Sequence, residues 1–147
     1  MPFNKITENT ICDCFHGAVE DVTNLFVRSV RKAPDLKDAD FRTHFEREKK
    51  PNNDNDCDEV CGFHGVSIEI WNDTSSPVLL KKYNYSASIS PKFKKNLSII
   101  KFKTNNGLVK HTPNQIFYNE YHYDFYKEDS FAVSDLELVD MIPLTAV

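Results

Sequence analysis

Glycine is scarce in this sequence, and long apolar runs are absent. The chain has four glycines in 147 residues and a mean hydropathy of −0.50. No apolar stretch approaches the roughly 18 residues that a membrane-spanning helix requires, so we expect no membrane span. The sequence also contains no Gly-rich phosphate loop, Rossmann fingerprint, nucleophile elbow or zinc-protease helix. These absences disfavour the common nucleotide-dependent enzymes.

Large aromatic side chains, in contrast, are abundant. With 11 Phe, 6 Tyr and one Trp, the sequence holds too many large apolar groups to remain unfolded in water. A length of 147 residues suits one hydrophobic core and leaves too little chain for a second independent one. We therefore predict a single domain over residues 1–147, with a net charge of −4.

The first part of the chain is predicted to be helical. Apolar residues within 17–33 recur at intervals of three and four, as on one stripe of an amphipathic helix that Pro34 would end. They are Ala18, Val22, Leu25, Phe26 and Val30. A second, shorter helix is expected over residues 37–50, and the polar residues 51–65 are expected to form a loop with one helical turn at most.

Beyond residue 65 the apolar period changes from helical to alternating, which is typical of strands. We predict strands at residues 66–71, 83–89, 97–103, 116–118 with 121–126, and 131–141, the last with a helical turn at 134–136. Helices followed by strands predict an α+β domain. In it, N-terminal helices within residues 1–50 pack on a largely antiparallel β-sheet formed by residues 66–147.

Two short groups of cysteine and histidine lie 45 residues apart. Because the N-terminus shows no basic stretch followed by an apolar segment, we expect a cytoplasmic protein whose cysteines are reduced, partly buried thiols and not disulfides. Redox chemistry is a further option. One zinc ion is the main alternative, since tetrahedral zinc takes ligands from two such groups and would join them. The candidate ligands are Cys12, Cys14, Cys57 and Cys61, with His16 or His64 as replacements.

The middle of the sequence is basic. Residues 80–111 hold eight lysines and no acid, whereas residues 112–147 hold one lysine and seven acids. Lysines interleaved with aromatic residues bind phosphate and stack on bases, so nucleic acid is a candidate partner. The candidate contacts are Lys81, Lys82, Lys92, Lys94, Lys95, Lys101 and Lys103. We favour the alternative that a basic strand lies beside an acidic one and is neutralised within the protein.

Candidate catalytic groups occur within residues 110–124. If two strands pair there, alternation places Glu120, His122 and Asp124 on one face, with His111 or Lys110 of the first strand facing them. Histidine oriented by a carboxylate is the usual arrangement for proton transfer. The candidate catalytic residues are His111, His122 and Asp124. They suit a small transferase or nuclease only if all three converge in a pocket, and otherwise they are rim residues of a polar strand.

The sequence contains no cofactor motif, and this favours a binding protein over an enzyme. We predict a non-catalytic binding or accessory protein that contacts another protein, with a single structural zinc left open. A nucleic-acid-contacting protein and a small enzyme are the two alternatives. No membrane partner is expected.

Overall fold

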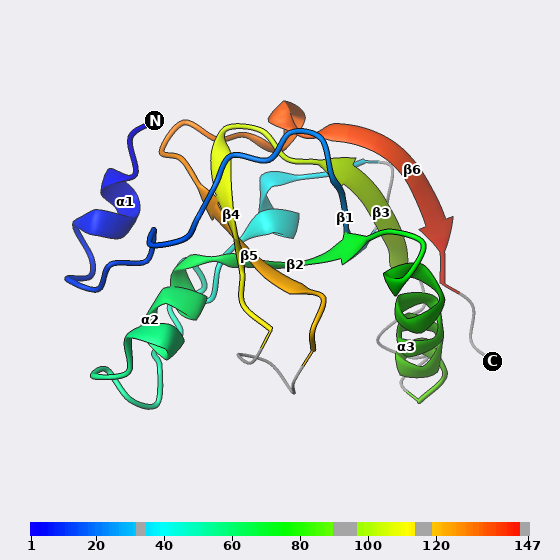
Figure 1. The fold of residues 1–147 in the computed structure, drawn as a ribbon, viewed down its shortest axis with the longest axis horizontal. Helices are drawn as coiled ribbons and strands as arrows, with labels where there is room; N and C mark the ends of the chain where they lie inside the picture. Colours follow the sequence, from blue (N-terminus) through cyan, green and yellow to red (C-terminus); the bar gives the residue numbers. More distant parts are fainter. Residues whose placement is uncertain (32–34, 90–96, 114–118, 145–147) are drawn as a thin grey trace.

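The computed structural model of the protein describes residues 1–31, 35–89, 97–113 and 119–144, and these residues form one six-stranded antiparallel sheet (Figure 1). The strands are β1 (Leu25–Arg31), β2 (Val66–Trp71), β3 (Leu97–Lys103), β4 (Gly107–His111), β5 (His122–Lys127) and β6 (Glu137–Pro143). Their order across the sheet is β4-β5-β2-β1-β3-β6. The first strand of the chain therefore lies near the centre of the sheet.

Helices are short, with one exception. They are α1 (Asn4–Thr7), η1 (Asp38–Phe41), α2 (Cys57–His64), α3 (Ser75–Ile89) and η2 (Val133–Asp135). Asp56 starts α2, since its side chain accepts hydrogen bonds from the backbone N–H groups of Asp58 and Glu59. Figure 1 shows α2 and α3 at opposite ends of the sheet. Within the described ranges, none of the helices has the length and apolar character needed to cross a bilayer.

One face of the sheet, which we term the aromatic face, forms the main core. It carries Phe26, Ile68, Phe102 and Phe125, all 1% exposed or less. Two connecting segments cover it: Phe41 of η1 packs edge-on against Phe102, and Phe131 packs edge-on against Phe125. Burial of each such side chain stabilises the fold by about 1.5–3 kcal/mol, so this face supplies much of the hydrophobic stabilisation.

The opposite face, which we term the polar face, is covered at its two ends. At one end Leu79 of α3 packs against Val27 and Ile99. At the other end the N-terminal segment and α2 form a cluster of Ile6, Cys14, Cys61 and Tyr126. Between these ends lie four polar residues of β2 and β5, namely Ser67, Glu69, His122 and Asp124. The polar face therefore positions ionisable groups between two apolar clusters.

The α+β class and the antiparallel sheet are confirmed, as are several strands. β2 and β3 occupy the predicted residues, and β5 and β6 overlap the predicted ranges. The helical turn expected at 134–136 corresponds to η2. The strand expected at 116–118 lies outside the described residues.

The predicted helix over residues 17–33 is wrong, because residues 25–31 of that stretch form β1. Gly17 has φ 79°, the left-handed region that favours glycine, and it lies in a turn and does not begin a helix. In β1 both Phe26 and Val27 are fully buried, one on each face of the sheet. A strand that is apolar on both faces loses its alternation, and its apolar residues then mimic helical spacing.

The predicted strand over residues 83–89 is also wrong, because these residues lie in α3. The side chain of Asn72 accepts from the backbone N–H groups of Thr74 and Ser75, and the Ser75 hydroxyl donates to the Ile70 carbonyl. These bonds turn the chain into the helix directly after β2. Leu79 and Tyr83, one helical turn apart, face the sheet.

Among the residues that the structure describes, the two predicted N-terminal helices packed on the sheet are accordingly not found. Residues 37–50 contain only η1 followed by turns, and residues 51–65 contain the eight-residue helix α2 where a loop with one turn was predicted.

Both edges of the sheet are protected against pairing with another strand. β4 is covered by Val19, whose backbone exchanges two hydrogen bonds with Val109. On β6 the Leu144 N–H donates to Leu97 of β3, so the backbone nitrogens of Met141 and Pro143 point outward. Met141 N–H is satisfied by the side chain of Asp140, and Pro143 has none. Recognition by addition of a strand is therefore disfavoured.

Gly107 is required at the start of β4 by a close approach of β5. A Cβ atom on this residue would lie 2.4 Å from Cε1 of Phe125 and 2.6 Å from the carbonyl oxygen of Tyr126. We expect Gly107→Ala to lower the free energy of unfolding by about 2–3 kcal/mol, because a backbone carbonyl in a sheet cannot move aside. Urea unfolding followed by circular dichroism measures this change, and a loss below about 0.5 kcal/mol would contradict the close contact.

Candidate functional site

Glu69 organises the buried polar groups where α3 meets the sheet. It is 6% exposed, and its carboxylate accepts hydrogen bonds from Lys82 Nζ at 3.0 Å, from Asn119 Nδ2 at 2.6 Å and from the Tyr83 hydroxyl. Burial and the neighbouring Glu69 carboxylate hold the pKa of Tyr83 well above its usual value, so its hydroxyl stays a donor. Three donors compensate the buried charge, and Glu69 thereby fastens α3 and residue 119 to β2.

His122 lies beside Glu69 in the pairing of β2 with β5. Its Nδ1 is 3.1 Å from the Thr112 carbonyl oxygen and its Nε2 is 3.1 Å from Ser67 Oγ. Nδ1 also lies 2.8 Å from Thr112 Oγ1. Because the carbonyl only accepts, a proton on Nδ1 satisfies both of these contacts and leaves Nε2 to accept from the serine hydroxyl. Burial lowers the pKa of His122, which keeps the ring neutral. With 3% exposure, the ring ties β2 to β5 and to the end of β4.

His111 does not join His122. It pairs with Tyr123 across β4 and β5, with ring centroids 4.8 Å apart, and its Nε2 lies 2.7 Å from the carbonyl oxygen of Glu120. Tyr123 alternates with Asp124 along β5, so His111 is on the aromatic side of the sheet and the other two candidates are on the polar face. The structure brings His122 and Asp124 to one face, and the convergence of all three side chains is not found.

Asp124 is a buried carboxyl with an unusual environment. It is 1% exposed, and within the described residues its Oδ2 has no hydrogen-bond partner, as is also true of the Tyr126 hydroxyl two positions later. Burial raises the pKa of Asp124 to about 7, although a hydrogen bond with the Thr112 side chain and the charge of Lys110, its pairing partner on β4, oppose the shift. A Cβ on Gly65 would lie 2.8 Å from that of Asp124, so the backbone closes this site tightly.

Sequence reasoning missed Ser67, Glu69 and Asn119 as members of this cluster. Ser67 and Glu69 occupy the polar positions of the predicted strand 66–71, where such residues usually face solvent. Only the pairing of β2 with β5, which joins residues about 55 positions apart, shows that they are covered.

The cysteines are paired as disulfides, which corrects the prediction of reduced thiols. Cys12 is bonded to Cys57, and Cys14 is bonded to Cys61. Cys57 and Cys61 lie one turn apart on α2, so both face the N-terminal segment. The inner bond is buried, with Cys14 0% and Cys61 4% exposed, whereas Cys57 is exposed. The two bonds fasten residues 12–14 to α2.

A zinc ion bound by Cys12, Cys14, Cys57 and Cys61 would require both disulfides to be reduced. Of the replacement ligands, His16 is exposed, and His64 is buried at the end of α2 against the ring of Phe45. In the described part of the chain, no three His, Cys, Asp or Glu side chains are grouped as a metal site. Zinc remains a prediction for the reduced chain.

Three of the candidate nucleic-acid contacts form ion pairs within the protein. Lys82 pairs with Glu69, and Lys101 and Lys103 of β3 pair with acids of the neighbouring strand β6 at 3.6 and 3.8 Å. Lys81 is exposed on α3. The remaining candidates, Lys92, Lys94 and Lys95, lie outside the described residues. A basic strand therefore does lie beside an acidic one, as the charge pattern suggested.

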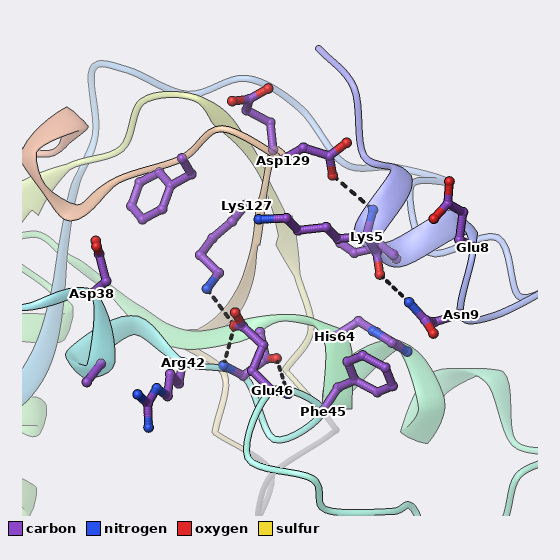
Figure 2. A pocket seen from close by; sticks show the side chains of 15 residues that line it. Lys5, Glu8, Asn9, Asp38, Arg42, Phe45, Glu46, His64, Lys127 and Asp129 are labelled. Carbon is purple, nitrogen blue, oxygen red and sulfur yellow. Dashed lines mark hydrogen bonds and ion pairs between the residues drawn. The ribbon is translucent and has the colours of Figure 1, made fainter.

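A cavity of about 510 Å³ lies beside the disulfide-linked end of the sheet (Figure 2). Four parts of the chain surround it: residues 5–9, residues 38–46, His64 and residues 127–131. Figure 2 shows Lys127 and Glu46 meeting in its middle, where Lys127 Nζ donates to Glu46 Oε1 at 2.5 Å. We term this cavity the pocket.

The wall of the pocket near the N-terminus is held in place by one acidic side chain. Asp129 accepts hydrogen bonds from the backbone N–H groups of Asn4 and Lys5 at 3.0 and 2.9 Å. Ile6 packs into the cluster that contains the buried disulfide. Both contacts orient the Lys5 side chain across the pocket, as Figure 2 shows. No local sequence signal marks this site, because its parts come from four separate segments between residues 5 and 131.

Comparison of the chain with models of protein families, with curated proteins and with solved structures finds no match.

Proposed function

We propose that this protein is a non-catalytic binding protein that recognises a segment of a partner protein through the pocket. The observation that carries the proposal is the convergence of four chain segments on an accessible cavity. The groups suited to acid–base chemistry, in contrast, are buried or lie on opposite faces of the sheet. An accessible cavity suits recognition of a ligand. Catalysis, in contrast, would need the acid–base groups to converge at one site.

The lining of the pocket suits a ligand that presents polar side chains next to an apolar one. Among the described residues, Lys5 and Arg42 have no acidic partner within ion-pair distance, and so they remain available to a ligand. Glu46, by contrast, is occupied by Lys127 and by the Thr43 backbone. Phe45, 40% exposed and stacked on His64, supplies an accessible aromatic surface. Aromatic surface surrounded by polar groups is typical of protein interfaces.

The two disulfides bear on where this binding form exists. Disulfides persist mainly in oxidising compartments and are rare in the cytosol. They therefore support an oxidising environment over the cytoplasmic location expected from the sequence. Labelling of free thiols in protein isolated from its native source, before and after reduction, separates the two: four thiols that appear only after reduction support the oxidising location.

Titration of ¹⁵N-labelled protein with N-acetyl amino-acid amides, one for each natural side chain, tests the proposal. We expect amide shifts that cluster at residues 43–46 and 127–131 for aromatic and charged probes, because these match Phe45 and the available cations. Alanine amide should produce none. Phe45→Ala should weaken the strongest of these interactions roughly tenfold, since it removes the aromatic contact.

Phe45 has a matched control in Tyr85, an exposed aromatic residue on the distant helix α3. Tyr85→Ala should leave the pocket shifts unchanged. Shifts scattered over the surface, or shifts that survive Phe45→Ala, would show that the pocket is not a recognition site.

A further inference from the structure

The side of α3 that points away from the sheet carries an apolar stripe. Val78 is 52% exposed, Tyr85 64% and Ile89 63%. At 3.6 residues per turn these three side chains lie within about 40° of one another, on the side opposite Leu79 and Tyr83. The fifteen-residue helix α3 is therefore apolar on two sides, of which one packs on the sheet and the other is exposed. We term the exposed side the outer face of α3.

Lysines flank this stripe on both sides. Lys81 and Lys82 lie either side of the line through Val78 and Tyr85, and the sequence of α3 contains no acidic residue. Lys82 is held by Glu69 but keeps a side chain that is 49% exposed. Among the described residues Lys81 has no acidic partner within ion-pair distance. The outer face thus combines apolar surface with two exposed lysines, of which Lys82 is paired with Glu69 and Lys81 has no acidic partner among the described residues.

We infer that the outer face of α3 is a docking surface for an acidic amphipathic helix of a partner protein. Val78 and Tyr85 are two turns apart, about 10.5 Å, and Ile89 follows one turn later, about 6 Å further. A partner helix with apolar residues at i, i+7 and i+11 matches this spacing. Acidic residues on both sides of its apolar line would meet Lys81 and Lys82.

Charge argues against a second copy of the chain as the occupant. Two α3 helices packed through their outer faces would bring two Lys81 side chains to one seam, each without an acidic partner among the described residues, and neither helix supplies an acid. β6 also exposes apolar side chains, but its edge is protected against pairing with a strand of another chain. The surface belongs to a different element from the pocket, so this inference does not depend on the proposed function.

Selection from a phage-displayed library of a single helix tests the inference. The library fixes leucine along an apolar line and randomises the flanking positions, and the oxidised protein is the target. We expect Asp and Glu to be enriched at the flanking positions. A selected peptide should bind roughly tenfold more weakly to Val78→Ser and to Lys81→Glu, because each removes one component of the surface.

Val139 on β6 provides the matched control, since it is 50% exposed against 52% for Val78. Val139→Ser should leave peptide affinity unchanged. Selection of basic or neutral flanks, no selected peptide, or affinity that survives Val78→Ser would each overturn the inference. So would Val78-dependent dimerisation in sedimentation equilibrium, Val78-dependent binding to vesicles of phosphatidylcholine and phosphatidylserine in place of peptide, or Lys81-dependent binding of single-stranded DNA in place of peptide.

Discussion

Replacement of all four cysteines by alanine is expected to lower the free energy of unfolding by about 6–7 kcal/mol, comparable to the whole stability of many domains. The bonded residues are separated by 45 and 47 positions. A first bond across such a loop restricts the unfolded chain by about 4 kcal/mol, and the second, which closes a ring of about eight residues, adds about 2–3 kcal/mol. We therefore expect the variant to be largely unfolded.

The two disulfides should differ when they are removed singly. With one bond intact, loss of the other opens the same small ring, so the entropic loss is about 2–3 kcal/mol in either case. The Cys14–Cys61 bond, however, is buried in a cluster with Ile6 and Tyr126, whereas Cys57 is exposed. We expect Cys14→Ala with Cys61→Ala to be less stable than Cys12→Ala with Cys57→Ala by about 1–2 kcal/mol, because only the former loses buried contacts.

Urea unfolding of the two double variants measures this difference, and each serves as the control for the other. Equal stabilities would show that packing around the inner bond contributes nothing. Metal analysis of the reduced wild-type protein tests the competing prediction at the same residues. About one bound zinc per chain, together with restored stability, would support a zinc site formed by the four thiolates.

The strands that could be predicted from the sequence are those with one strongly apolar face. In β3, Ile99 and Ile100 are buried on opposite faces, but Ile100 and Phe102 still alternate with lysines that pair with the acids of β6. In β1, by contrast, both faces are buried, so the alternation that identifies a strand is lost. In α3 the exposed Tyr85 and Ile89 produce a false alternation with the buried positions. The same exposed residues form the outer face of α3, so the failed prediction coincides with the surface that we infer to be functional.

The candidate site shows the same division between local and long-range information. Alternation correctly places His122 and Asp124 on one face of β5, because that depends only on their own strand. The position of His111 depends on the register of β4, and a shift of one residue moves every side chain to the other face. Lys110, and not His111, is the residue opposite Asp124. The zinc hypothesis likewise required the two cysteine groups to meet, and they do meet, through disulfides.

Asp124→Asn is expected to change how stability depends on pH. Burial raises the pKa of Asp124 from 3.8 to about 7. Between these values the folded carboxyl holds a proton that the unfolded chain releases, so folding is disfavoured as the pH rises through this window. The total is about 4 kcal/mol, from about three pKa units at 1.36 kcal/mol each. Relative to the wild type, the variant should therefore gain up to about 4 kcal/mol of stability from pH 4 to pH 8.

The comparison with wild type at each pH isolates this effect from the histidines. Burial lowers the pKa values of His64 and His122, so both lose stabilising energy as the pH falls below about 6.5, the opposite sign. They are present in both proteins and cancel in the difference. Asp135→Asn is the matched control, because a hydrogen bond from the Ala132 N–H lowers the pKa of Asp135 and its carboxylate stays ionised from pH 5 to 8. If the difference in stability between Asp124→Asn and the wild type does not change from pH 5 to pH 8, the Asp124 carboxyl reaches water. The polar face would then be open where the structure closes it with Gly65.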